Sequence, residues 1–148
     1  MRWLLDTNVV SETIRRQPSK AVIRWISQLE PDDAALSLVT MAELAVGVAT
    51  APDADFRERL SRWLNTSVIA RLGDKTLPLT QEILVDWLSI SRRLALKRIA
   101  RAAPDLLIAS TARVHHLTVV SRNVRDFADT GIVVYDPWHD QTHRMNTP

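Results

Sequence analysis

The sequence predicts an α/β fold in which a central parallel sheet of four to five short strands is covered by helices on both faces. The main observation is that short apolar runs of strand length alternate along the chain with longer segments of helical periodicity. Composition agrees, since 46% of the 148 residues are hydrophobic and 24% are charged, as in ordinary globular domains. A chain of this length fits one domain with its own core.

Strands are expected where a short apolar run is bounded by turn residues. In chain order these runs are 3–5, 34–38, a weaker one at 77–79, 116–120 and 132–135. Pro78 restricts the weaker run to a sheet edge or a strand end, because proline donates no hydrogen bond to a ladder. A helical segment separates each strand from the next, so parallel pairing is expected.

Helices are expected where apolar residues recur every three to four positions. In chain order they are a turn at 11–15, then 19–29, 39–49, 54–64, 80–94 and 104–115, and a short turn at 124–127. Ser19 and Thr80 can cap two of these helices. Pro104 suits a first helical position, where its missing N–H needs no partner. Pro18 and Pro31 mark helix ends.

Residues 1–136 are expected to form the domain, and the polar segment 137–148 a flexible tail. The chain has no cysteine, which excludes disulfides, thiolate metal sites and a cysteine nucleophile. With 3 glycines it has no glycine-rich phosphate loop. Asp6 comes too early for a signal peptide, and no apolar run approaches the roughly 18 residues of a membrane span. A cytoplasmic protein without a membrane association is therefore expected.

Four acidic residues occupy places that a parallel sheet would bring to one edge: Asp6, Glu43, Asp105 and Asp126. Asp6 directly follows the first expected strand, and ligands collect at the carboxyl edge of such sheets. Carboxylates this close repel one another unless a cation neutralises them. Oxygen ligands without cysteine favour Mg²⁺ or Mn²⁺. For each acid taken alone, the alternative is a helix cap or a surface charge.

A basic segment lies just before Asp105. It contains Arg92, Arg93, Lys97, Arg98 and Arg101, with no acid between Ser91 and Arg101. Such a cluster suits a polyanion and would make binding salt-sensitive. The alternative is a solvated helix face.

The segments that carry the four acids resemble, in order and at natural spacing, the motifs of the PIN-domain ribonucleases, and more closely the VapC and FitB toxins of type II toxin–antitoxin pairs. The segments are LLDTNVVSE at 4–12, LVTMAELAVG at 38–47, PDLLIASTA at 104–112 and VVSRNVRDF at 119–127. The match extends over residues 3–135. It implies a PIN-like fold and a Mg²⁺- or Mn²⁺-dependent endoribonuclease that hydrolyses RNA phosphodiester bonds with a metal-activated water.

The resemblance also assigns roles to individual residues. Asp6, Glu43 and Asp105 match acidic positions of the family that are catalytic and hold the metal. Many PIN domains have an Asp where this chain has Asn123, and the acid here comes three residues later. Asp126 is therefore expected as the fourth catalytic acid, an outer-sphere or water-mediated metal ligand. Polar neighbours that hold these ligands in place are expected at Thr7, Asn8, Ser121 and Asn123.

Partners follow from the same resemblance. The resemblance implies an RNA substrate and a second copy of the chain in a homodimer. It also implies a VapB-like DNA-binding antitoxin that wraps across a groove between helices 19–29 and 54–64. Operator DNA would be reached through that antitoxin. One alternative is a PIN nuclease without an antitoxin. Another is an inactive PIN module that acts as an antitoxin-dependent DNA-binding corepressor. An aspartyl-phosphate phosphatase would need an acid at position 8, where the chain has Asn8.

Overall fold

The computed structural model describes residues 1–30 and 32–147, so Pro31 and Pro148 lie outside the described residues. Within these ranges six strands form one sheet in the order β3-β2-β1-β4-β5-β6. They are β1 (Trp3–Leu5), β2 (Ala34–Ser37), β3 (Thr76–Leu77), β4 (Thr118–Val120), β5 (Val133–Asp136) and β6 (Gln141–Arg144). The first five pair in parallel, and β6 runs antiparallel to β5. The predicted α/β class with a mostly parallel sheet is confirmed.

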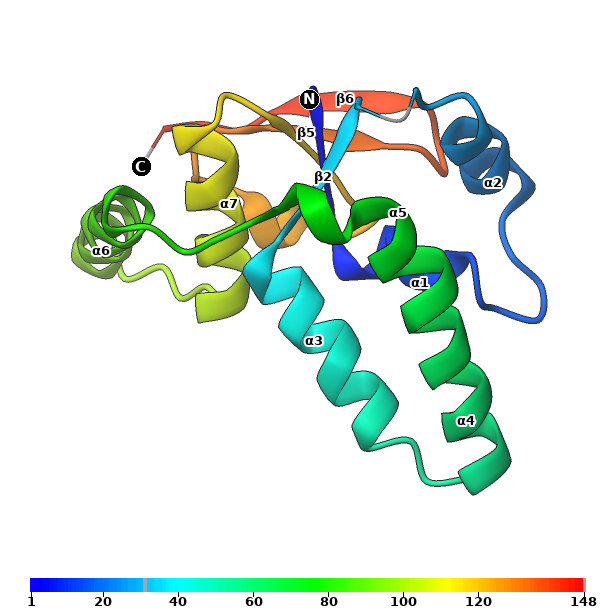
Figure 1. Ribbon diagram of the computed structural model, residues 1–148. Coiled ribbons are helices and arrows are strands. Elements are labelled where there is room, and N and C mark those ends of the chain that lie inside the picture. Colours follow the sequence, from blue (N-terminus) through cyan, green and yellow to red (C-terminus); the bar gives the residue numbers. More distant parts are fainter. Residues whose placement is uncertain (31, 148) are drawn as a thin grey trace.

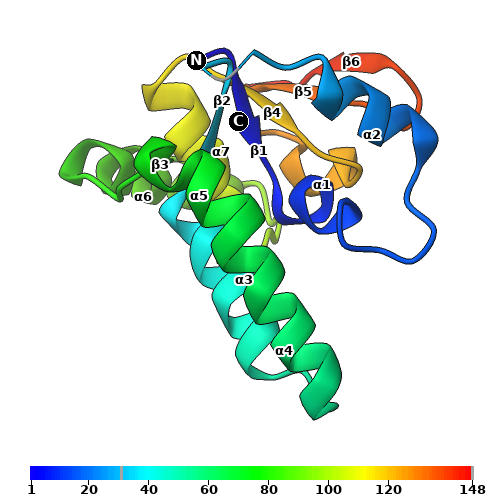
Figure 2. The same ribbon diagram turned by 45° about the vertical axis from the view of Figure 1, so that its right-hand side comes forward.

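The helices cover both faces of this sheet (Figure 1). They are α1 (Thr7–Glu12), α2 (Lys20–Ser27), α3 (Leu38–Ala49), α4 (Ala54–Trp63), α5 (Ala70–Leu72), α6 (Gln81–Leu96) and α7 (Ala103–Val114). Short π- and 3₁₀-helical turns are η1 (Leu64–Ile69), η2 (Gly73–Lys75) and η3 (Val124–Phe127). Helices α3 and α4 form a hairpin that projects away from the sheet (Figure 2).

Two hydrophobic clusters lie on opposite faces of the sheet, because successive side chains of a strand point to opposite sides. Leu5 packs with residues of α1, α2 and α4 in one cluster. Leu4 packs with residues of α7 and η3 in the other. Helix α6 then packs on the outside of α7 through Ile90, Leu94 and Leu106. The central strand β1 is thereby held from both sides, and its carboxyl end is fixed in position.

Local capping begins the helices where the sequence predicted. The Ser19 side chain accepts a hydrogen bond from the Val22 N–H, and Thr80 accepts one from the Ile83 N–H. Pro104 lies in the first turn of α7, which starts one residue earlier than predicted, at Ala103. The first helix also starts earlier, at Thr7 instead of Ser11, because Asp6 caps it through the Thr7 N–H. No helix within the described ranges is long and apolar enough to cross a membrane.

The prediction of a loose tail is wrong for Gln141–Arg144, which form the edge strand β6. Backbone hydrogen bonds continue the pairing, from Met145 N–H to the Ile132 carbonyl and from Gly131 N–H to the Asn146 carbonyl, both at 2.8 Å. The side chains of β6 are mostly exposed, so this strand has no apolar alternation that the sequence could reveal. Its backbone pairs with β5, and the polar side chains suit an exposed sheet edge. The sheet therefore has one strand more than predicted.

Candidate active site

Asp6 lies at the carboxyl end of β1, where the chain turns into α1. Its carboxylate is 6% exposed and accepts three hydrogen bonds, from the Thr7 N–H at 2.7 Å, the Asn8 amide at 2.7 Å and the Ser121 hydroxyl at 2.6 Å. The Thr7 bond makes Asp6 the N-cap of α1, so the capping alternative raised by the sequence holds for this residue. The orientation of the Asp6 carboxylate is thus set by neighbours from two strand ends.

Ser121 joins the ends of the two central strands β1 and β4. Besides donating to Asp6, its hydroxyl oxygen accepts hydrogen bonds from the Asn8 amide and the Asn123 N–H, each at 3.0 Å. The Asn8 carbonyl oxygen accepts from the Arg122 N–H at 3.2 Å. The structure therefore brings together the predicted polar neighbours around Asp6, although they come from segments more than 110 residues apart.

Glu43 approaches Asp6 from helix α3. The Thr7 hydroxyl donates a hydrogen bond to its Oε2, while the Thr7 N–H donates to Asp6. Thr7 therefore links two carboxylates through two of its own groups. This link places Glu43 on the same side of the sheet edge as Asp6, and it spans 36 residues of sequence.

Asp105 completes the group from the first turn of α7. Burial, and after it the negative charges of Asp126, Asp6 and Glu43 in that order, together raise the pKa of Asp105 to about 6. The pKa of Asp6 is also raised, chiefly by burial, against the lowering effect of its three hydrogen bonds. Burial is the main cause of both shifts, and repulsion between neighbouring carboxylates adds to it.

The three inner acids line one open hollow together with Thr7, Asn8 and Asn123. Asp126 does not line it; the side chain is exposed on η3 and is close enough to act electrostatically on Asp105. The rest of the lining comes from α3, namely Val39, Ala42, Val46 and Gly47. These four were not predicted as site residues. Val39, Val46 and Gly47 lie three or four positions from Glu43, so helical periodicity around that acid indicates them, whereas Ala42 has no such signal.

Among the described residues, no three His, Asp or Glu side chains converge closely enough to form a ready-made metal site. The chemistry of the donors nevertheless fits a hard divalent cation, since every candidate ligand is a carboxylate oxygen. Within the same residues the Asp105 carboxylate accepts no hydrogen bond, so its oxygens remain available. A cation would also relieve the repulsion that raises the pKa of Asp105.

The five basic residues of the predicted segment separate into two groups. Arg92 and Arg93 near the end of α6, and Lys97 and Arg98 just after it, are exposed. Arg101 is half-buried, and its guanidinium donates to the Ala128 carbonyl and the Asp129 carboxylate at 3.3 and 3.2 Å. Arg101 thus holds the loop before α7 against the turn at 128–129, a role that the sequence did not indicate.

The sequence and the fold correspond to a known class of protein. Residues 3–133 match the model of the PIN-domain family, and the chain belongs to that family. The chain is similar to Toxin FitB of Neisseria gonorrhoeae, with 35% identity over 137 residues that cover 93% of this chain and 99% of the relative. It is 29% identical over 135 residues to VapC ribonuclease Y4jK of Sinorhizobium fredii, covering 91% of this chain and 96% of that protein.

Solved structures agree with this assignment. The crystal structure of FitAcB from Neisseria gonorrhoeae superposes with a TM-score of 0.87 at 34% identity, covering 93% of this chain and 99% of that one. DNA-bound VapBC from Salmonella typhimurium gives a TM-score of 0.77 at 26% identity, covering 93% of this chain and 98% of that one. The predicted resemblance to the VapC and FitB type is confirmed.

Proposed function

We propose that this chain is the toxin of a type II toxin–antitoxin system and acts as a Mg²⁺- or Mn²⁺-dependent endoribonuclease. The observation that carries the proposal is the meeting of Asp6, Glu43 and Asp105 in one open hollow at the carboxyl edge of the sheet. Support comes from the relatives, which are named a toxin and a VapC ribonuclease. An open hollow suits a polymeric substrate better than an enclosed pocket would.

The proposed ligands of the metal are Asp6, Glu43 and Asp105, with Asp126 acting through water from the rim. When bound, the divalent ion would lower the pKa of a water and neutralise charge that develops on the phosphate. The chain's own contribution is orientation. Ser121 and Asn8 hold the Asp6 carboxylate, and Thr7 holds both Asp6 and Glu43. Asn123 lies at the hollow as a polar neighbour for water or phosphate.

In the proposed reaction the oxygen of a water attacks the phosphorus and the bond between phosphorus and the 3′-oxygen breaks. A carboxylate of the hollow accepts the proton of the attacking water. The leaving 3′-oxygen takes up a proton, so the products carry 5′-phosphate and 3′-hydroxyl ends. Exposed Arg92, Arg93, Lys97 and Arg98 are proposed to contact the RNA backbone, and Arg93→Glu with Arg98→Glu is expected to weaken RNA binding but not metal binding.

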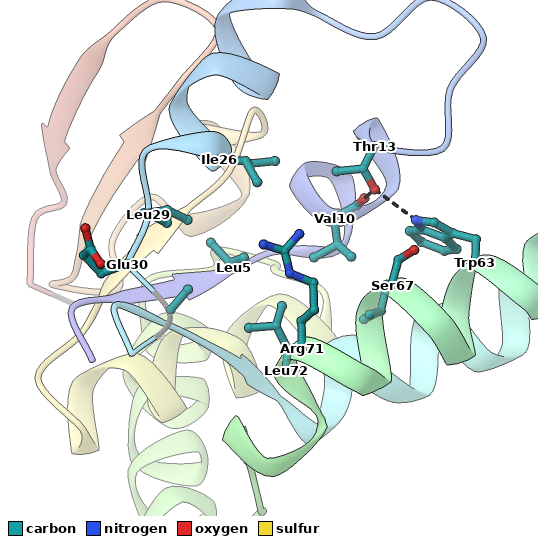
Figure 3. Close-up of a pocket in the computed structure, with 12 residues that line it drawn as sticks. Leu5, Val10, Thr13, Ile26, Leu29, Glu30, Trp63, Ser67, Arg71 and Leu72 are labelled. Atoms are coloured by element: carbon teal, nitrogen blue, oxygen red, sulfur yellow. Dashed lines mark hydrogen bonds between the residues drawn. The ribbon is translucent and has the colours of Figure 1, made fainter.

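An antitoxin is the proposed partner of a second surface. An apolar cavity lies between α2 and the α4–α5 region (Figure 3). Its walls include Leu5, Val10, Ile26, Leu29 and Trp63. It falls between the two helices predicted to bind an antitoxin. We propose that a VapB-like antitoxin covers it and links the toxin to operator DNA, as the related DNA-bound VapBC complex suggests. A homodimer and a cytoplasmic location remain predictions.

The test is cleavage of total RNA and tRNA by the purified chain with Mg²⁺, with Mn²⁺ and with EDTA, with Asp6→Asn alongside. Cleavage that requires metal and disappears in Asp6→Asn is expected. Calorimetry of metal binding provides a readout that does not depend on the RNA pool. If the chain neither cuts RNA nor binds metal, the ribonuclease proposal fails and the DNA-binding corepressor alternative becomes the leading one.

A further inference from the structure

We propose that a groove beside the active site, named here the arginine groove, binds the backbone and one base of single-stranded RNA. It is defined by Arg15 and Arg16 after α1 and by Phe56 and Arg59 on α4. This inference rests on the proposed ribonuclease function and adds a route for the substrate. None of these four residues belongs to the basic segment at 92–101.

The arginine groove is continuous with the acidic hollow. Thr7, Glu43 and Gly47 line both depressions, so one opens directly into the other. A Cβ at Gly47 would meet no atom within 4 Å, which means that no side chain separates the two depressions at that point. An RNA strand whose scissile phosphate lies at the acids can therefore continue into the groove.

Apart from Glu43, which it shares with the hollow, the charged side chains of the groove are arginines. Arg15, Arg16 and Arg59 are all exposed. Arg15 pairs at 3.3 Å with Glu12, while Arg16 makes no hydrogen bond or ion pair within residues 1–30 and 32–147. Guanidinium groups bind phosphate through paired hydrogen bonds, which makes arginine suited to a nucleic-acid backbone. Phosphates next to the scissile one would find cations here.

Phe56 adds a surface for a base. This side chain is 38% exposed, and the Arg59 guanidinium lies 5.0 Å from its ring centroid. Grooves that bind single strands combine cations for the backbone with aromatic rings on which bases stack. An acidic peptide could pair with the arginines, but its carboxylates would not stack on the Phe56 ring. The carboxylates of the adjoining hollow would also repel such a peptide. The combination favours RNA.

The groove is also distinct in position from the basic segment on α6. Helices α4 and α6 lie on opposite sides of α3 (Figure 1). The two basic surfaces would therefore contact different parts of a substrate, and substitutions can separate them.

The test measures binding of a labelled single-stranded RNA by fluorescence anisotropy over a series of salt concentrations. All proteins carry Asp6→Asn so that the RNA stays intact. The test variant is Arg16→Gln with Arg59→Gln, and the matched control is Arg24→Gln with Arg62→Gln, which removes the same charge from exposed sites on α2 and α4 outside the groove. The slope of log affinity against log salt is expected to fall by about 0.7 per lost phosphate contact, with roughly tenfold weaker binding near 0.1 M salt.

A second pair of variants separates stacking from charge. Phe56→Ala is expected to weaken RNA binding by about fivefold or more through lost stacking, with an unchanged salt slope. Phe56→Leu keeps an apolar side chain without the flat ring, so it should lose nearly as much affinity. Melting curves by circular dichroism check that each variant is folded.

Three results would overturn the inference. The first is that the arginine variant binds RNA with the same affinity and salt slope as the Arg24 and Arg62 control. The second is that Phe56→Leu binds RNA as tightly as the protein that retains Phe56. The arginine variant could also lose binding of a hexaglutamate peptide while keeping RNA, which would make the groove a protein-binding site. In each case RNA cleavage by the unsubstituted chain shows whether the proposed function still stands. Absence of both cleavage and RNA binding in the unsubstituted chain removes the proposed function and this inference together.

Discussion

The acidic hollow and the apolar cavity of Figure 3 lie on opposite sides of the same short segment. Leu5 lines the cavity, and the next residue, Asp6, lines the hollow. In the hollow, the buried Asp6 and the half-buried Asp105 have raised pKa values, and neighbouring negative charge contributes to both shifts. In the cavity, apolar side chains such as Val10 and Trp63 belong to the larger core cluster. Adjacent residues of one segment therefore serve the proposed chemistry and the packing of the core. Substitutions of the acids should chiefly change cleavage, and substitutions of the apolar side chains should chiefly change stability.

The largest expected effect is on catalysis in the hollow. Asp6→Asn should lower RNA cleavage by roughly a hundredfold to ten-thousandfold, the range for loss of a positioned acid or base. The metal-free melting temperature should change little, because relief of a desolvated charge offsets weaker hydrogen bonds from Ser121 and Asn8. Cleavage rates and thermal melts of the same preparations check this. A melting temperature that collapses would show that the hollow also supports the fold.

The next effect is on stability at the cavity. Trp63 is 9% exposed, and its ring N–H donates to the Thr13 hydroxyl at 3.0 Å. Trp63→Ala should lower the free energy of unfolding by about 3–5 kcal/mol, measured by urea denaturation. Because Trp63 also lines the arginine groove, cleavage is measured at saturating RNA, where the rate per folded molecule should be unchanged.

A pair of milder variants isolates the hydrogen bond of Trp63. Trp63→Phe should lower the free energy of unfolding by about 1 kcal/mol more than Trp87→Phe does. The ring N–H of Trp87 is buried and has no hydrogen-bond partner in the described part of the chain, so Trp87→Phe removes no hydrogen bond. Equal losses for the two variants would contradict this account of Trp63.

An effect smaller than that of Trp63→Ala is expected when the hydrogen bond from Ser121 to Asp6 is removed. Ser121→Ala should lower the free energy of unfolding by about 1.5–3 kcal/mol, because a hydrogen bond to a buried charged group is lost. Ser110→Ala is the matched control, since the Ser110 hydroxyl is equally buried and finds no partner among the described residues. Ser121→Ala should also reduce cleavage, whereas Ser110→Ala should not. Equal effects of the two substitutions on both measurements would argue against the proposed role of Ser121.

The mildest test uses pH. The pKa of Asp105 in the folded chain is about 6, above its ordinary value of 3.8, so the folded state binds the proton more tightly than the unfolded state. The metal-free chain should therefore lose stability as pH rises through the window from about 4 to about 6. Asp105→Asn should flatten this dependence in thermal melts. At pH 7, Mg²⁺ or Mn²⁺ should raise the melting temperature more than at pH 5, because protonated carboxyls bind metal poorly.

Much of the architecture was determined by local sequence signals. The caps at Ser19 and Thr80 begin helices where predicted, since a capping side chain acts on N–H groups only a few residues away. The strands at 3–5 and 34–37 follow from apolar runs with turn residues around them. Asp6, Glu43 and Asp105 were selected because each lies at or next to the expected carboxyl edge of the sheet. The parallel order of the strands then places these three acids at one edge of the sheet, where they line one hollow.

Only the tertiary structure decided how these parts interact. The Ser121–Asp6 and Thr7–Glu43 hydrogen bonds join residues 115 and 36 positions apart, which no local pattern encodes. The same applies to Arg101, which pairs within the fold, and to β6, whose polar residues become a strand only because β5 offers a free edge. The raised pKa of Asp105 likewise depends on burial and on distant charges. Local propensity acts over a few residues, whereas contacts, burial and electrostatics depend on where the chain returns in space.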